Sequence, residues 1–183
     1  MANKVKYGLK NVYYAIATEG TGGVLTYSTP VAWRGAVSLS LDAQGEMSTF
    51  RADNTDYWKG NSNSGYEGDF ESALIPESFR TDVLGEVANQ TSGITAEYAN
   101  KPTVEFALLF QFEGDESATR HVLYRCIASR PSVSGQTTDA AIEPQTETLT
   151  ISAMPRLNDD LIKGRATEGA TAYANWFTEV QEP

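Results

Sequence analysis

Residues 65–85, with the sequence GYEGDFESALIPESFRTDVLG, constrain the fold more than any other stretch, because two kinds of element meet there. The first half alternates in polarity from one residue to the next, which is the period of a β-strand. One face carries apolar side chains that need a core, Tyr66, Phe70 and Leu74. The other face carries a row of three carboxylates, Glu67, Asp69 and Glu71. The pattern predicts a half-buried strand whose acidic face lies in water or against a neighbour.

A short helix is predicted to follow this strand. Pro76 suits the first helical position, because its missing N–H would have no partner there. Phe79 and Val83 are four residues apart and share one helical face. Gly85 can end the helix in a left-handed conformation. We therefore expect a strand followed by a helix that packs back through its apolar side.

Most other regular segments also alternate. The strongest is 103–112, whose apolar face is formed by Val104, Phe106, Leu108, Phe110 and Phe112. Further strands are predicted at 11–17, 24–27, 35–41, 120–129 and 146–153. In 35–41 the side chains expected to point inward are Val37, Leu39 and Leu41. The tail 155–183 is less regular, but a short docking helix is suggested by the spacing of Tyr173, Trp176, Phe177 and Val180.

The sum of these elements predicts a mainly β fold of the α+β class, as a β-sandwich or part-barrel with one short flanking helix. The chain has 183 residues, which suits one domain spanning 1–183. Nine Tyr, seven Phe and fifteen Gly favour β structure over helix.

The segment 42–64 is predicted to be a long hairpin that serves as a contact between subunits. Asp53 and Asn54 are typical of a tight turn, and the aromatic pair Tyr57 and Trp58 follows. An insertion of this length in a compact domain is usually functional or disordered. The alternative is that the two aromatic rings pack at the base of their own hairpin.

The charge balance and the cysteine content exclude several functions. The formal net charge of −10 makes the chain a poor ligand for DNA or for an anionic membrane, since both would repel it. Cys126 is the single cysteine, so no disulfide framework forms within the chain, which fits the cytosol. No run approaches the roughly 20 apolar residues of a membrane span. We expect a protein made in the cytoplasm that does not bind a membrane.

Residues with catalytic or metal-binding chemistry are few and unspecific in their spacing. His121 is the single histidine, and neither a nucleophile elbow nor a Cys-x-x-Cys motif is present. Cys126 is expected to be a buried structural thiol. Asp53 to Asp56 could offer oxygen ligands to calcium, but turn chemistry explains them better. We predict no catalytic residue, no cofactor and no metal.

The sequence resembles a known family along nearly its whole length. The segments in which the resemblance is found are VKYGLKNVYYA, AVSLSLDAQGE with FRADN, GYEGDFESALIPESFRTDVLGE, FALLFQFEGD, RHVLYRCIASRPSVSG and EPQTETLTISAMPR. They are similar to the phi13-like major tail proteins of long-tailed phages and prophages of Gram-positive bacteria. The resemblance implies a tail-tube β-sandwich and a structural protein of the virion.

The resemblance also implies an assembly and its partners. Subunits would form homohexameric rings that stack into the tail tube through which DNA leaves the virion. The tape measure protein would lie inside the tube, the tail terminator and distal tail proteins at its ends, and DNA would pass without specific binding. Exposed edges of strands 35–41 and 65–74 would be covered in such a ring. Glu67, Asp69 and Glu71 are then expected to face the lumen, where a row of like charges is tolerated.

Two other functions remain open at this point. A monomeric carbohydrate-binding β-sandwich could use Trp33, Tyr57 or Trp58 as stacking platforms. A glycosidase could use Glu67 and Glu71. They belong to a row of three carboxylates on one strand face, in which neighbouring members are two residues and roughly 7 Å apart.

Overall fold

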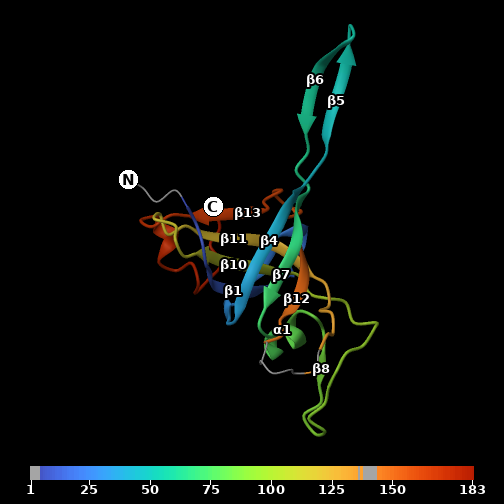
Figure 1. Ribbon diagram of the computed structural model, residues 1–183, viewed down its shortest axis with the longest axis vertical. Helices are drawn as coiled ribbons and strands as arrows, with labels where there is room; N and C mark the ends of the chain where they lie inside the picture. The colour runs from blue at the N-terminus through green and yellow to red at the C-terminus, as the bar shows by residue number, and fades with distance from the viewer. Residues whose placement is uncertain (1–4, 136, 138–143) are drawn as a thin grey trace.

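One large antiparallel sheet forms the body of the protein in the computed structural model, which describes residues 5–135, 137 and 144–183 (Figure 1). Its strands are β1 (Leu9–Glu19), β2 (Leu25–Tyr27), β3 (Val31–Trp33), β4 (Ala36–Gln44), β7 (Gly65–Ser72), β10 (Phe106–Phe112), β11 (Arg120–Ala128), β12 (Glu147–Ala153) and β13 (Lys163–Ala166). The main path runs β2-β1-β10-β11-β12-β7-β4, with β3 beside β1 and β13 beside β11.

Two hairpins and few helical turns complete the described chain. The long hairpin joins β5 (Met47–Ala52) to β6 (Thr55–Asn61), and a small one joins β8 (Val87–Ala88) to β9 (Thr95–Ala96). The single α-helix is α1 (Glu77–Asp82), and two short 3-10 turns are η1 (Thr21–Gly23) and η2 (Thr171–Tyr173). The predicted mainly β fold with one short helix and a long hairpin is confirmed.

The sheet is buried on both faces along its central strands. One cluster, the inner core, contains Phe70, Phe79, Phe106, Leu108 and Leu149 among its members. The second core lies on the other face and is built around Ala107, Leu109, Val122, Tyr124 and Trp176. Strand β10 therefore contributes alternate residues to the two cores. The sequence predicted only one buried face for this strand, whereas both faces are buried. Val104 precedes β10 and stays 37% exposed, so its predicted place in the core was wrong.

The stretch 65–85 folds as predicted except at the junction of its two elements. Phe70 is fully buried, but Leu74 is 72% exposed, which contradicts its predicted place in the core. Strand β7 ends at Ser72, whose hydroxyl donates to the Leu74 carbonyl oxygen at 2.8 Å and accepts from the Trp33 indole at 2.9 Å. This bend breaks the alternation and sends Ile75 inward in place of Leu74.

Helix α1 closes one end of the inner core. Phe79 and Val83 are both fully buried, as their spacing predicted. Pro76 is the cap residue that precedes the helix and not its first residue. Gly85 has φ = 76°, the left-handed conformation expected after a helix.

Strand β4 lies at one end of the sheet and pairs only with β7 in the described chain. Leu39 and Leu41 pack against the inner core, as predicted. A register shift between Ala36 and Ser38 leaves Val37 50% exposed, so its predicted inward position was wrong.

The C-terminal segment packs against the second core without forming the predicted α-helix. Two main-chain bonds after η2 have the 3-10 pattern, from Trp176 N to Tyr173 O and from Thr178 N to Asn175 O, and one bond from Glu179 N to Asn175 O spans four residues without extending into an α-helix. Trp176 is nevertheless buried, and Tyr173, Phe177 and Val180 pack on the second core. The aromatic residues thus dock the tail as expected, on tighter turns than an α-helix.

Candidate assembly surfaces

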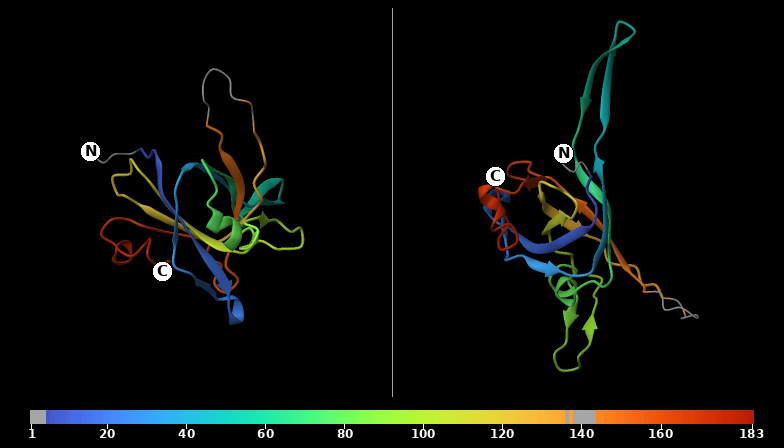
Figure 2. Two further views of the ribbon diagram at one scale, coloured as in Figure 1. Left: turned by 90° about the horizontal axis from the view of Figure 1, so that it is seen from below. Right: turned by 60° about the vertical axis from the view of Figure 1, so that its left-hand side comes forward.

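The hairpin β5–β6 projects from the body as an isolated two-stranded ribbon (Figures 1 and 2). Asp53 and Asn54 form its tip with φ of 50° and 58°, the left-handed pair that a two-residue type I′ turn requires. The turn predicted from the Asp-Asn dipeptide is therefore confirmed. A ribbon of two strands alone is marginally stable in water, so this element needs a partner or strong internal pairs.

Internal pairs stabilise the shaft of the hairpin but leave its aromatic residues exposed. Asp56 pairs with Arg51 at 3.3 Å and with Lys59 at 3.0 Å. Phe50 lies opposite Trp58 in the ladder. Tyr57 is still 70% exposed and Trp58 56%, so the aromatic pair does not pack into the base of the hairpin. Exposed aromatic side chains of this kind are typical of an interaction surface.

Strands β7, β12 and β4 present one continuous polar face, which we call the hydroxyl–acid face. Its acids are Glu67, Asp69, Glu71 and Asp42, and its hydroxyl residues are Ser38, Ser40, Thr148, Thr150 and Ser152. Three hydroxyl groups donate to the carboxylates: Thr146 to Glu71 at 2.6 Å, Ser38 to Glu71 at 3.1 Å and Thr150 to Asp69 at 3.1 Å. The strand alternation thus places the predicted acidic row opposite the inner core.

The acids of this face have no cationic partner in the described part of the chain. Asp42 lies directly opposite Glu67 in the ladder, which puts like charges side by side. Asp42 was not predicted as a member of this face. Its signal was present, because Asp42 continues the outward period of Ser38 and Ser40. The result is a negative patch on a rigid sheet.

The two ends of the sheet differ from the prediction in one respect. Strand β4 is an edge, as expected for 35–41, and β2 forms the other end of the main path. Strand β7 is not an edge, because it pairs with β12 on one side and β4 on the other. The expected free edge at 65–74 was therefore wrong. An edge strand offers unpaired N–H and C=O groups to another chain.

The residues weighed for chemistry lie in structural positions. His121 stacks on Phe110 with ring centroids 5.2 Å apart, and burial and nearby Lys6 lower its pKa. Cys126 is fully buried, which raises the pKa of its thiol. Trp33 is only 3% exposed, so it cannot serve as a carbohydrate platform.

Neither a metal cluster nor a membrane helix is found within the described ranges. Histidine, cysteine and carboxylate side chains do not gather there in groups of three or more that could hold an ion. The described helices are all too short or too polar to cross a bilayer.

Comparisons with known proteins identify the fold and leave the family open. No protein-family model and no curated protein matches the sequence. A chain in the cryo-EM structure of the anti-feeding prophage tube terminating cap matches over 91% of this chain and 95% of its own, with 11% identity and a TM-score of 0.50.

Two more solved structures were found. One is the sheath/tube terminator of an extracellular contractile injection system in the extended state, with 8% identity, coverage of 91% and 100%, and a TM-score of 0.47. The other is the anti-feeding prophage baseplate, with 11% identity, coverage of 93% and 99%, and a TM-score of 0.49. The match to the anti-feeding prophage cap shows that this chain shares its fold with a chain of that cap.

Proposed function

We propose that the protein is the structural subunit of a phage tail tube, of the phi13-like major tail protein family, and that it assembles into stacked hexameric rings. The fold shared with a chain of a tube terminating cap supports this proposal across most of the sequence. The observation that carries it is the projecting hairpin β5–β6, whose aromatic residues Tyr57 and Trp58 stay 70% and 56% exposed. A subunit that contacts a copy above or below it explains such an element.

Ring closure would use the two ends of the sheet. Strand β4 of one subunit would meet β2 of its neighbour, at the other end of the main path, so that successive sheets form one closed barrel. A head-to-tail contact that repeats around an axis produces a closed ring and uses different surfaces on the two partners. The unpaired edge groups of each subunit would then be satisfied.

The hydroxyl–acid face would line the channel of this barrel. Its carboxylates lack cationic partners, which makes the face costly to bury in a tight contact but suitable for a water-filled channel. DNA carries about one negative charge per 1.7 Å of axis, so an acidic wall would repel it and allow passage. The tape measure protein would occupy the lumen before ejection, and tail terminator and distal tail proteins would bind the ends. The protein would act in the virion, without catalysis.

Size-exclusion chromatography with negative-stain microscopy tests the proposal. At high protein concentration we expect rings or tubes of uniform diameter. A protein that stays monomeric up to millimolar concentration, and that binds oligosaccharides through Tyr57 and Trp58, would instead support the carbohydrate-binding alternative. Tyr57→Ser with Trp58→Ser separates the two functions, because it should block tubes in one case and sugar binding in the other.

A further inference from the structure

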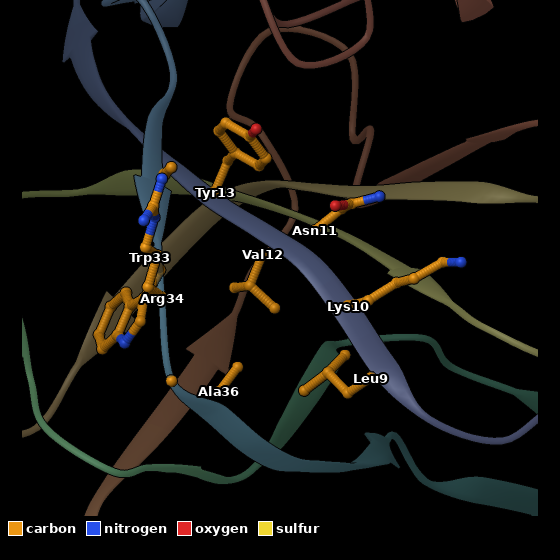
Figure 3. Close-up of a pocket in the computed structure, with 10 residues that line it drawn as sticks. Leu9, Lys10, Asn11, Val12, Tyr13, Trp33, Arg34 and Ala36 are labelled. Carbon is orange, nitrogen blue, oxygen red and sulfur yellow. The ribbon is translucent and has the colours of Figure 1, made fainter.

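A cleft opens where the chain crosses from one side of the sheet to the other (Figure 3). The β1–β3 ladder ends at the pair Val12–Trp33, and the chain then leaves β1 to begin β4 at Ala36. The space between has a volume of about 390 Å³ and is bordered by residues 9–13 and 32–36. Leu9, Val12 and Ala36 point into it. The cleft therefore combines a small apolar floor with open strand backbone.

The cleft is bordered by cations. Arg34 and Lys10 extend on opposite sides of it (Figure 3). Lys10 has a weak partner, Glu113 at 3.7 Å, and its side chain is 42% exposed. Arg34 is exposed and forms no ion pair within residues 5–135, 137 and 144–183. In a chain with a net charge of −10, an unpartnered arginine beside a cleft is suited to a carboxylate.

A second hollow shares a wall with this cleft. Ala32 and Arg34 border both, and the second hollow also includes Leu74 and Ile75. Leu74 is 72% exposed, which is unusual for a large apolar residue beside a concave surface. Arg34 thus stands between the cleft and a second hollow, whose lining combines the apolar Leu74 and Ile75 with the charged Glu77, Arg80 and Glu147.

The tip of the hairpin carries the matching charge. Asp56 on the shaft is already paired with Arg51 and Lys59, at 3.3 and 3.0 Å. Asp53 at the tip has no ion pair in the described chain, and the tip is only two residues wide. The exposed aromatic residues follow directly behind it on β6.

The cleft and the hairpin lie at opposite ends of one strand. Strand β4 begins at Ala36 beside the cleft and ends at Gln44, from which the chain continues into the hairpin. Figure 1 shows the hairpin projecting from the end of the molecule opposite α1, while β4 begins near α1. A tip that reaches along this axis meets the cleft end of a second copy in the same orientation. Such a head-to-tail contact repeats without limit.

We propose that the hairpin tip of one copy seats in the cleft of the next copy along the tube axis, with the Asp53 carboxylate paired to Arg34 of that copy. Tyr57 and Trp58 then lie over the second hollow, beside Leu74. The inference rests on the proposed tube function and adds to it the receiving site and the ion pair that sets the register.

A charge-reversal cycle tests the pair. Asp53→Arg alone and Arg34→Asp alone should each raise the protein concentration needed for tubes by roughly tenfold or more, since like charges then meet at the contact. The two substitutions together should restore tubes. Recovery in the double variant also excludes damage to the turn as the cause, because the double variant carries the same altered tip. Arg165→Asp is the charge-matched control on an exposed position of β13 and should leave tube formation unchanged.

A disulfide cross-link gives a second, independent readout. Thr55→Cys with Ala32→Cys keeps both charges, and oxidation of assembled protein should give a ladder of covalent multimers. The native Cys126 is buried and does not compete. Thr55→Cys with Thr167→Cys is the control and should give no ladder. Parent-like tubes from both charge-reversal single variants, or tubes of the cysteine pair that give no ladder, would overturn the docking site and leave the tube function intact. A parent protein that forms neither rings nor tubes would overturn both.

Discussion

Phe106 lies in the inner core, where strand β10 packs against helix α1. It is fully buried on β10 and meets the ring of Phe79 from α1 edge to face, with centroids 5.2 Å apart. We expect Phe106→Ala to lower the free energy of unfolding by about 3–5 kcal/mol, since a large ring leaves a cavity in the inner core. The same alternation predicted that Val104 lies in the core, but this residue is exposed. Val104→Ala should therefore lower the free energy of unfolding by less than about 1 kcal/mol. Urea denaturation of both variants checks this; equal losses would mean that the inner core is wrongly placed.

His121 gives stability a pH dependence. Burial first, and then the nearby positive charge of Lys6, hold its pKa below the ordinary value of 6.5, while Asp115 opposes the shift and Arg165 and Lys163 add to it. The unfolded chain therefore takes up this proton at higher pH than the folded one. The stability from neutral His121 is complete above the unfolded pKa and is lost as pH falls through the folded pKa.

The measurement is the free energy of unfolding between about pH 7.5 and pH 5.5, a window above the range of most carboxylates. The parent should lose stability across it, and His121→Phe, which keeps the stack on Phe110, should lose less. If the free energy of unfolding falls equally with pH in the parent and in the variant, the pKa of His121 does not differ between the folded and the unfolded chain.

The errors at single residues have local physical causes. Phe70, Phe79 and Gly85 were placed correctly because period and turn chemistry determine them. Leu74 was misplaced because the strand ends two residues earlier, where the Ser72 hydroxyl bonds the Leu74 carbonyl oxygen. Val37 was misplaced because a register shift in β4 turns it outward. Alternation alone cannot reveal either event.

At the scale of elements, the hairpin was the most predictable feature. Asp-Asn at the centre of a segment flanked by aromatic residues determined its turn, and the structure has that turn. The aromatic residues of the C-terminal segment also predicted correctly that it packs against the body of the protein. They did not predict that it forms 3-10 turns in place of an α-helix. The cleft was not predictable, because it arises where strand β3 leaves β1 and β4 joins β7, a crossing that involves residues far apart in the sequence.

Shortening the hairpin tests its role. Replacing residues 53–60 by a short Gly-Ser turn should leave a folded subunit, because these residues make no contribution to either core. The variant should remain soluble but fail to elongate. Far-UV circular dichroism and thermal unfolding check the fold, and electron microscopy checks the assembly. Tubes of normal length from this variant would contradict the proposed contact.

At the scale of the whole molecule, the order of the strands in the sheet could not be predicted from the sequence. The fold class followed from the number and period of the strands. The position of β7 between β12 and β4, and the burial of β10 on both faces, depend on long-range pairing that no local pattern encodes. The second core was missed for the same reason.

The hydroxyl–acid face is expected to serve passage of DNA more than assembly. Changing Glu67, Asp69 and Glu71 together to Lys should still allow tubes, since channel residues need not touch a neighbour. Those tubes should bind DNA, and the binding should weaken as salt shortens the Debye length from about 30 Å at 0.01 M to about 8 Å at 0.15 M.

The neutral variant Glu67→Gln, Asp69→Asn and Glu71→Gln separates charge from shape and should bind DNA less than the Lys variant. Filter binding or co-sedimentation of tubes with linear DNA measures the effect. A Lys variant that assembles and binds no more DNA than the parent would place these carboxylates outside the channel.

Cryo-EM of the assembled protein is the decisive test of the proposed tube. We expect stacked rings of six subunits, with the hairpin β5–β6 crossing from each ring to the next and Glu67, Asp69 and Glu71 facing the channel. A map of a closed assembly without stacked rings, or of a tube with all three carboxylates on its outer wall, would contradict it.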